Sequence, residues 1–359
     1  MSNKLFSPAT LGTITLKNHI VMSPMTRSRA IKNIPNDLMA EYYGQRSGAG
    51  LIITEGTSPS PNGLGYARIP GIFSKEQVIG WKKVTSAVHV KGSKIFVQLM
   101  HTGRISHKDN MPASAVIIAP SAIAAMGQMW TDNNGMQNYP IPKEMTKDDI
   151  IKTKEEFIVT AKNAIEAGFD GVELHSANGY LLNQFLTPGS NQRKDEYGGN
   201  IEKRCRFIIE VAEATVKTIG KEKTGIRLSP YGTANDVKEF EETESEYSYL
   251  SEKLYAVGLV YIHLVDHSSM GAPKVKPSTI QKIRKNFKNT LILSGGYDRQ
   301  RAEKDLQSGA GDLIAFGKLF ISNPDLVYRL EKGIALSSPD MNTFYTPDAH
   351  GYTDYPFVS

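Results

Sequence analysis

Short apolar runs recur along the chain, each bounded by Gly, Pro, Ser or Asn. Near-continuous apolar runs of this length are typical of strands that are buried on both faces, as in a parallel sheet covered by helices. The eight runs are His19–Met25, Gly50–Thr57, Lys94–His101, Gly171–Ala177, Thr224–Pro230, Leu259–Asp266, Thr290–Gly296 and Asp312–Lys318.

Segments with helical periodicity separate most of these runs. Thr153–Ala167 and Ile201–Ile219 are examples, and glycines suited to a helix C-cap, Gly168 and Gly309, precede later strands. Eight strand–helix units favour a single α/β domain over residues 1–359, built as a (β/α)8 TIM barrel. An open, doubly wound sheet is the alternative.

Three segments lie outside the strand–helix repeat. Leu11–Leu16 predicts a β-hairpin ahead of the first strand, placed as a plug at the bottom of the barrel. Residues 102–147, after the third strand, are too many for a simple connection and predict a folded flap that serves the site. The aromatic-rich tail Asn342–Ser359 is expected to pack against the barrel.

Alternation along the strands separates helix-facing side chains from inward ones. In Lys94–His101 one set of alternate positions is wholly apolar and faces the helices, while the other set, which includes Gln98, faces the interior. The same alternation turns Glu173, His175 and Arg227 inward. Polar side chains inside a barrel indicate a site.

An inward arginine requires an anionic partner. One interpretation is an internal ion pair between Arg227 and Glu173. The other is an electron-rich ligand at the barrel mouth, and a flavin ring fits: the Gln98 amide can bridge its pyrimidine edge, and a guanidinium near N1 stabilises its reduced form.

Glycines follow the seventh and eighth strands, where backbone N–H groups of a barrel often bind phosphate. These positions are Gly295, Gly296 and Gly317, followed by the cation Lys318. Plain turns would also contain such glycines. Both loops together with the lysine favour a phosphate site.

Three polar side chains leave the fourth strand within six residues. His175 and Asn178 can donate two hydrogen bonds to one carbonyl oxygen and so polarise a conjugated C=C bond. Tyr180 carries a phenol suited to protonating the developing enolate carbon. A lone His or Tyr would more often be structural, but three on one loop favour catalysis.

Composition and missing motifs narrow the class of protein. The chain has 359 residues, 40% of them hydrophobic, and a net charge of +5 without a basic cluster, which argues against nucleic-acid binding. The single cysteine, Cys205, excludes an internal disulfide and a cysteine-ligated cluster, and suggests a cytoplasmic setting. We expect no signal peptide, no membrane span, no catalytic metal and, without a Gly-x-Gly-x-x-Gly motif, no dinucleotide domain.

The motifs resemble those of the Old Yellow Enzyme family, over about Leu5 to Pro356. The specific stretch is His175–Leu186, continued by Asn191–Arg193 and Asp195–Gly199. Supporting matches are Ser23–Arg27, Gln98, Arg227–Pro230, Phe316–Lys318 and Asn323–Leu326.

The resemblance implies an FMN-dependent ene-reductase with tightly bound, non-covalent FMN. Flavin-binding residues would be Pro24, Met25, Thr26, Gly56, Gln98 and Arg227, with the phosphate at Gly295, Gly296, Gly317 and Lys318. His175 and Asn178 would bind the substrate carbonyl, Tyr180 would donate the proton, and Tyr66, Met100 and Tyr352 would border the substrate pocket.

The reaction implied by the resemblance is ping-pong. NADPH or NADH reduces the flavin and leaves, and an enone, nitroalkene, maleimide or nitrate ester takes its place. Three positions depart from the usual pattern: Lys318 replaces an arginine, Met100 a tryptophan, and Asn178 a second histidine. The alternatives are a flavin-binding stress-response protein with little turnover and a flavin-independent barrel lyase or isomerase acting on a phosphate ester.

Overall fold

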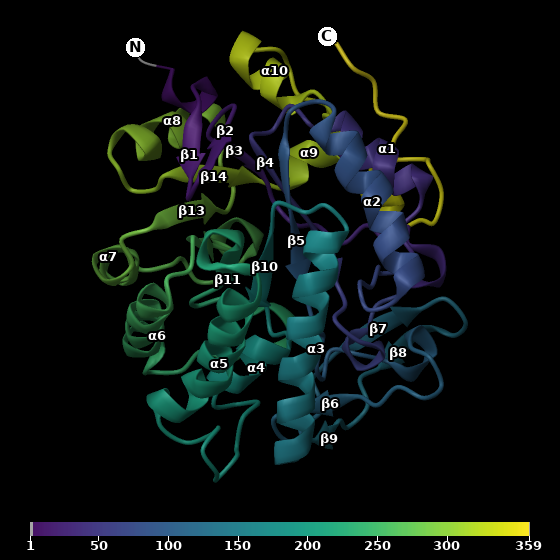
Figure 1. Ribbon diagram of the computed structural model, residues 1–359, viewed down its shortest axis with the longest axis vertical. Coiled ribbons are helices and arrows are strands. Elements are labelled where there is room, and N and C mark those ends of the chain that lie inside the picture. The colour runs from purple at the N-terminus through teal and green to yellow at the C-terminus, as the bar shows by residue number, and fades with distance from the viewer. Residues whose placement is uncertain (1–2, 359) are drawn as a thin grey trace.

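Eight parallel strands close into a barrel in the computed structural model, which describes residues 3–358 (Figure 1). The barrel strands are β3 (Ile20–Met22), β4 (Leu51–Thr57), β5 (Lys94–Leu99), β10 (Gly171–Ser176), β11 (Thr224–Leu228), β12 (Tyr261–Val265), β13 (Thr290–Ser294) and β14 (Leu313–Phe316). They pair in chain order, and β14 pairs with β3 to close the ring. The (β/α)8 prediction is confirmed, and the open sheet is wrong.

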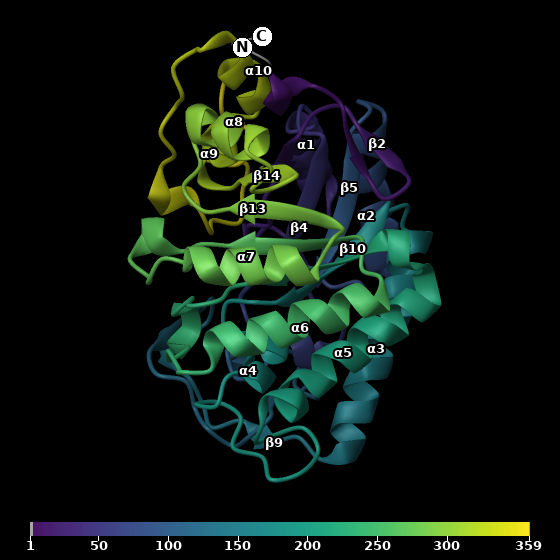
Figure 2. The same cartoon turned by 90° about the vertical axis from the view of Figure 1, so that its left-hand side faces the viewer.

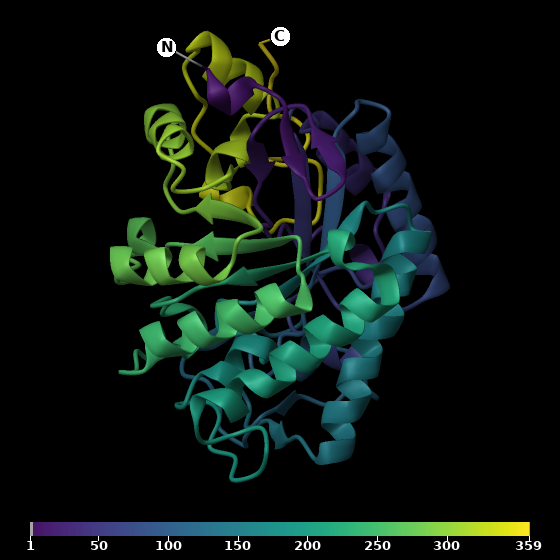
Figure 3. The same cartoon turned by 60° about the vertical axis from the view of Figure 1, so that its left-hand side comes forward.

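Helices surround the barrel, with α3 beside α5, α5 beside α6 and α6 beside α7 (Figures 2 and 3). The α-helices are α1 (Asp37–Gln45), α2 (Lys75–His89), α3 (Lys147–Glu166), α4 (Leu181–Leu186), α5 (Ile201–Ile219), α6 (Thr243–Val257), α7 (Pro277–Asn286), α8 (Arg299–Gln307), α9 (Lys318–Ser322) and α10 (Leu326–Lys332). Single 3-10 turns span Lys4–Phe6, Ile31–Asn33, Pro61–Gly63, Lys108–Asn110, Lys221–Lys223, Ala234–Asp236, Ser268–Met270 and Met341–Thr343.

Local capping explains where the helices begin and end. Thr146 and Asp149 form a capping box, so α3 starts at Lys147, earlier than the predicted Thr153. Gly168 and Gly309 follow α3 and α8 with φ of +89° and +72°, which only glycine adopts at little cost. The predicted C-capping glycines are therefore confirmed.

Each predicted apolar run contains a barrel strand, but several strands end before the run does. β3, for example, stops at Met22, and residues 23–25 lie in the loop that follows. The register places Gln98 beside Glu173, and Arg227 between His175 and His263. The polar residues predicted to point inward thus lie on neighbouring strands, from β5 to β11, and His263 extends the group to β12.

The predicted N-terminal hairpin is present as β1 (Ala9–Leu11) and β2 (Ile14–Leu16), which pair antiparallel. Its apolar side chains share one buried cluster with inward residues from the N-terminal parts of the barrel strands. In that cluster the hairpin supplies Ala9, Leu11 and Leu16, and the barrel supplies Val21, Leu51, Ile53, Phe96, Tyr261, Ile292, Leu313 and Ala315. Its role as a plug stays a prediction.

The segment 102–147, predicted to be a flap, contains short strands and lies at the opposite end of the molecule from the hairpin (Figures 1 and 2). Its role as a flap stays a prediction. Its short strands are β6 (Ile118–Ala119), β7 (Gln128–Thr131), β8 (Gly135–Asn138) and β9 (Lys143–Glu144), paired β6 with β9 and β7 with β8.

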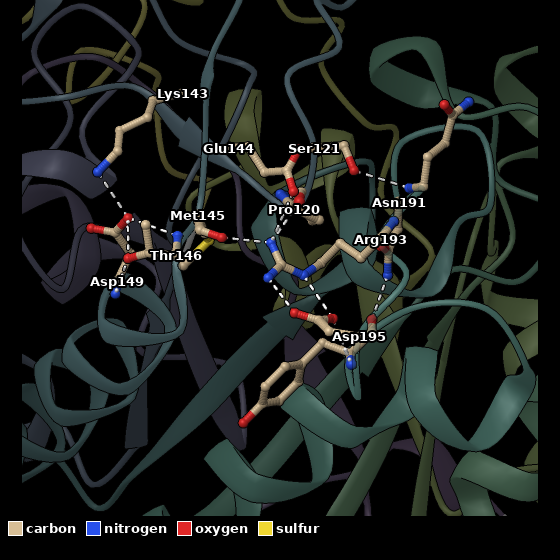
Figure 4. Close-up of polar contacts among 12 residues, drawn as sticks. Pro120, Ser121, Lys143, Glu144, Met145, Thr146, Asp149, Asn191, Arg193 and Asp195 are labelled. Carbon is tan, nitrogen blue, oxygen red and sulfur yellow. Dashed lines mark hydrogen bonds and ion pairs between the residues drawn. The ribbon is translucent and has the colours of Figure 1, made fainter.

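A buried arginine fastens this flap to the loop after α4 (Figure 4). Arg193 donates to the flap carbonyls of Pro120 and Met145 at 3.0 and 2.5 Å. Asp195 accepts two further bonds from the same guanidinium and holds it in place. Residues 120 and 145 of the flap are therefore fixed to the loop after α4.

The C-terminal tail packs against the loop after β3, as predicted for Asn342–Ser359; Ser359 itself lies outside the described residues. Arg27 donates to the Gly351 carbonyl at 2.8 Å, and Arg29 donates to the Phe344 carbonyl at 2.6 Å. Tyr352 stacks on Tyr42 with ring centroids 4.0 Å apart. The tail is thereby tied to the first barrel strand.

Candidate active site

A chain of hydrogen bonds crosses the barrel interior below its mouth. Gln98 Nε2 donates to Glu173 Oε1 at 2.7 Å, and His263 Nδ1 donates to Glu173 Oε2 at 2.9 Å. His263 Nε2 accepts from the Ser294 hydroxyl at 3.1 Å. Both carboxylate oxygens of Glu173 therefore accept a hydrogen bond, and the Gln98 amide is oriented with its side-chain oxygen unbonded in the part of the chain that the structure describes.

Arg227 lies next to this chain but outside it. The residue is 7% exposed, and its Nε is fully buried without a hydrogen-bond partner among the described residues. It makes no ion pair with Glu173 within 4.0 Å, so the first of the two interpretations, an internal ion pair, does not hold, because Glu173 is bound by Gln98 and His263. Burial lowers the pKa of the guanidinium, which a nearby anion would reverse.

The predicted flavin wall comes from the ends of β3 and β4. Pro24 is buried, whereas Met25 and Thr26 are half-buried. Gly56 has no room for a side chain, because an added Cβ would lie 2.4 Å from the Met100 sulfur. A glycine here therefore keeps the strand surface flat beside Met100.

The predicted phosphate loops follow β13 and β14. Gly295 and Gly296 have φ of +126° and +61°, and a Cβ on Gly295 would lie 2.1 Å from a backbone carbonyl, that of Asp266. Lys318 is exposed and forms no hydrogen bond or ion pair with a described residue. Gly317 lies close to Met25, whose sulfur is 3.7 Å from the position of an added Cβ, so the last and first strands meet here.

A second cation supports the first of these loops. Arg301 on α8 donates to the Gly295 carbonyl at 2.7 Å and lies over the Tyr297 ring. Nothing in its sequence context indicated this contact.

These residues fit FMN. Among the described residues, the Arg227 guanidinium is buried without a partner and the Gln98 amide is oriented with its oxygen unbonded. The tight glycine loop after β13, the glycine after β14 and Lys318, unpaired within residues 3–358, complete a donor set for the pyrimidine edge and the phosphate.

The catalytic group predicted from the sequence gathers at the end of β10. The rings of His175 and Tyr180 meet edge to face with centroids 4.9 Å apart, and Tyr180 donates to the Tyr66 hydroxyl at 3.0 Å. Asn178 has a φ of +59° at the turn between them. Gln184 Nε2 donates to the Gly179 carbonyl at 2.7 Å, which fixes this turn.

The local electrostatics keep these groups neutral. Burial, and then the charge of Arg227, lower the pKa of His175 well below its ordinary value. Its Nδ1 is buried and has no hydrogen-bond partner within residues 3–358, which leaves Nε2 as the nitrogen that can meet a ligand. Burial raises the pKa of Tyr180, and more strongly that of Tyr66. A neutral imidazole and a protonated phenol are the states that the predicted chemistry needs.

The two remaining predicted pocket residues are fully buried. Met100 is 1% exposed and packs with Tyr66 and Tyr180 in one apolar cluster. The ring contacts of Tyr352 are with Tyr42 and arginines of the tail anchor, not with the other predicted substrate residues. Their roles at the pocket stay predictions.

The described residues contain neither a metal-binding cluster nor a membrane-spanning helix. Between Asn3 and Val358, no three His, Cys, Asp or Glu side chains are arranged to hold a metal ion. Over the same residues, no helix has the length and apolar character required to cross a membrane.

Comparison with known proteins identifies the family. A sequence model of the NADH:flavin oxidoreductase / NADH oxidase family matches residues 4–337. The chain is 43% identical to the putative 12-oxophytodienoate reductase 5 of Oryza sativa subsp. japonica, over 97% of this chain and 92% of the relative. It is 38% identical to a probable flavin mononucleotide-dependent alkene reductase of Leishmania infantum, over 99% and 97%.

Solved structures of the same family match the fold of this chain. Morphinone reductase matches with a TM-score of 0.95 and 41% identity, covering 99% of this chain and 97% of that one. The old yellow enzyme homologue from Zymomonas mobilis matches with a TM-score of 0.94 and 38% identity, covering 99% and 100%.

The chain belongs to the NADH:flavin oxidoreductase family, the Old Yellow Enzyme group. It is a flavin-dependent oxidoreductase that uses FMN and a reduced nicotinamide to reduce activated C=C bonds, as the sequence predicted. The flavin-independent lyase or isomerase is set aside.

Proposed function

We propose that this enzyme reduces small conjugated carbonyl compounds, with His175 and Asn178 binding the carbonyl oxygen and Tyr180 delivering the proton. The observation that carries the proposal is the grouping of these three side chains at the end of β10, beside the unpaired Arg227. Relatives named as reductases of 12-oxophytodienoate, of morphinone and of alkenes support a small unsaturated substrate.

The carbonyl clamp is formed by two neutral donors. The open nitrogen of His175 and the amide nitrogen of Asn178 each present an N–H, and both donors are positioned before substrate arrives. Donors aimed at an oxygen where charge develops stabilise the transition state more than the ground state. The clamp thereby withdraws electrons from the conjugated bond.

Proton delivery falls to Tyr180. Burial holds its pKa above the ordinary value, so the phenol remains protonated at neutral pH and can release a proton to a strongly basic enolate carbon. The hydroxyl of Tyr66 accepts its hydrogen bond at 3.0 Å and fixes the rotation of the phenol O–H.

The cofactor residues are those that fit FMN above. Gln98 and Arg227 would hold the pyrimidine edge, Pro24, Met25, Thr26 and Gly56 would line the ring, and Gly295, Gly296, Gly317 and Lys318 would hold the phosphate. When bound, FMN supplies hydride accepted from NADPH or NADH. Residues 1–359 would act as one FMN-binding unit with 102–147 as its flap, in a reducing compartment such as the cytoplasm.

The test uses the purified protein and visible absorbance. Excess reduced nicotinamide without oxygen should bleach the flavin, and cyclohex-2-enone should then restore the colour with formation of cyclohexanone. A protein that gains no flavin absorbance with FMN would contradict the cofactor assignment. A protein that is bleached but not reoxidised by any enone, nitroalkene or maleimide would instead support the alternative of a flavin-binding protein with little turnover.

A further inference from the structure

Three of the four polar groups of Asn178 already have partners. Its backbone N–H donates to Ser229 Oγ at 2.9 Å, and its carbonyl accepts from Asn235 Nδ2 at 2.8 Å. Its side-chain oxygen accepts from His267 Nε2 at 2.7 Å. Only the amide nitrogen has no partner among the described residues, and it is the group that a carbonyl substrate requires.

The backbone contacts fix where Asn178 lies but not how its amide is turned. The terminal torsion of asparagine is broad, and a half-turn exchanges the oxygen and the nitrogen. With the oxygen facing the pocket, Asn178 would repel a substrate carbonyl and leave His175 as the single donor. Catalysis therefore depends on a contact that distinguishes the two ends of the amide.

We propose that His267 is a positioning residue, whose Nε2–H binds the Asn178 oxygen and so turns the amide NH2 toward the substrate carbonyl. The inference rests on the proposed clamp of His175 and Asn178. His267 follows β12, so the clamp on β10 is aligned by a residue from two strands away in the barrel.

The environment of His267 suits this role. Its imidazole forms no other hydrogen bond with the described residues, and the residues after it, Ser268–Met270, are exposed. Burial, and then the charge of Arg227, lower the pKa of His267 to about 4. The ring is therefore neutral, and its one N–H lies on the nitrogen that faces the carbonyl-type oxygen.

Substitution of His267 separates this role from simple packing. His267→Leu removes the N–H donor, whereas His267→Gln keeps an N–H near the position of Nε2. Ser268→Ala is the matched control, since it changes the same loop without touching Asn178. For each variant that retains flavin, cyclohex-2-enone is titrated into oxidised enzyme through the flavin absorbance, and the reduced enzyme is then reoxidised by enone in a stopped-flow instrument.

Loss of one oriented hydrogen bond should lower the ratio of the reoxidation rate constant to Kd by about fivefold to tenfold in His267→Leu. His267→Gln should recover most of the loss, and Ser268→Ala should match the wild type. Reoxidation of all variants by oxygen, which needs no carbonyl clamp, should be unchanged.

A double-mutant comparison completes the test. Because His267 acts through Asn178, His267→Leu should cause no further loss when Asn178 is already alanine. The proposal would be overturned if the double mutant lost activity by the product of the two single-mutant factors, or if His267→Gln were as impaired as His267→Leu. Either result would leave the clamp of His175 and Asn178 intact. Normal enone binding in Asn178→Ala alone would instead show that the clamp itself is wrong, and the role of His267 would fall with it.

Discussion

Replacing Tyr180 with phenylalanine removes the proposed proton donor and little else. The phenol loses its hydrogen bond to Tyr66, worth about 1 kcal/mol, so the fold should be retained. General acid catalysis contributes roughly 100-fold to 10,000-fold in rate. We therefore expect reoxidation by a weakly activated enone to slow by at least about 100-fold, while reduction of the flavin stays near the wild-type rate.

Tyr66→Phe provides the matched control. It leaves the Tyr180 phenol in place and removes only the hydroxyl that accepts its hydrogen bond at 3.0 Å. Loss of that bond, at about 1 kcal/mol, corresponds to roughly a fivefold change in rate. The two variants differ by one oxygen atom each and are expected to differ widely in the oxidative half-reaction.

Anaerobic stopped-flow absorbance measures the two half-reactions separately. Since burial raises the pKa of Tyr180 above its ordinary value, the wild-type reoxidation rate should stay level from about pH 6 to about pH 9 and fall only as the phenol deprotonates at higher pH. Equal slowing of both half-reactions in Tyr180→Phe, or equal damage from Tyr66→Phe, would refute the assignment of Tyr180 as the acid.

Four further predictions follow from the site. Replacing both His175 and Asn178 with alanine should cost about 3–6 kcal/mol in kcat/KM for enones, and unchanged enone kinetics would refute the clamp. The Kd of oxidised enzyme for cyclohex-2-enone should be constant from about pH 6 to about pH 8, because the pKa of His175 lies well below its ordinary value; a midpoint near 6.5 would show a clamp that titrates. Met100→Trp should shift the preference between a small and a bulky cyclic enone by about 1–3 kcal/mol, and unchanged relative kcat/KM and enantiomeric excess would exclude Met100 from the pocket wall. Gly295→Ala should lower the free energy of unfolding in urea by about 2–4 kcal/mol and weaken FMN retention, whereas Gly309→Ala, at an open position, should cost about 1 kcal/mol; equal losses would contradict the packing argument.

Strand alternation accounts for how much of the site could be read from the sequence. Because side chains alternate strictly, Gln98 and Arg227 could be assigned to the barrel interior from the order of residues alone. Alternation gives the direction of a side chain but not its partner. Alternation therefore left two interpretations of Arg227 open, and the internal pair with Glu173 is the one that does not hold. Glu173 is bound instead by Gln98 and by His263, and the sequence analysis did not single out His263.

Contacts made by loop residues have no sequence pattern comparable to the alternation along strands. The bond from His267 to Asn178 needs a positive φ at Asn178 and a particular exit from β12, and neither leaves a periodic pattern. Met100 predicts a wider pocket unless Met129 or Trp130 fills the space. In the structure Trp130 is 55% exposed, whereas Met129 is buried against the same two tyrosines that pack on Met100. Side-chain volume alone could not show whether Met129 or Trp130 packs near Met100.

The pairing of β14 with β3 determines when the site can form during synthesis. These two strands come from opposite ends of the chain, and the loops that follow them meet at Gly317 and Met25. A nascent chain therefore cannot close the barrel until residues near 316 have left the ribosome, and any sheet formed before then would have two unpaired strand edges. The tail residues Phe344 and Gly351 then bind Arg29 and Arg27 next to the first strand. A chain truncated before the tail would lack these contacts to the loop after β3. FMN present during synthesis could assist assembly only after nearly the whole chain had emerged.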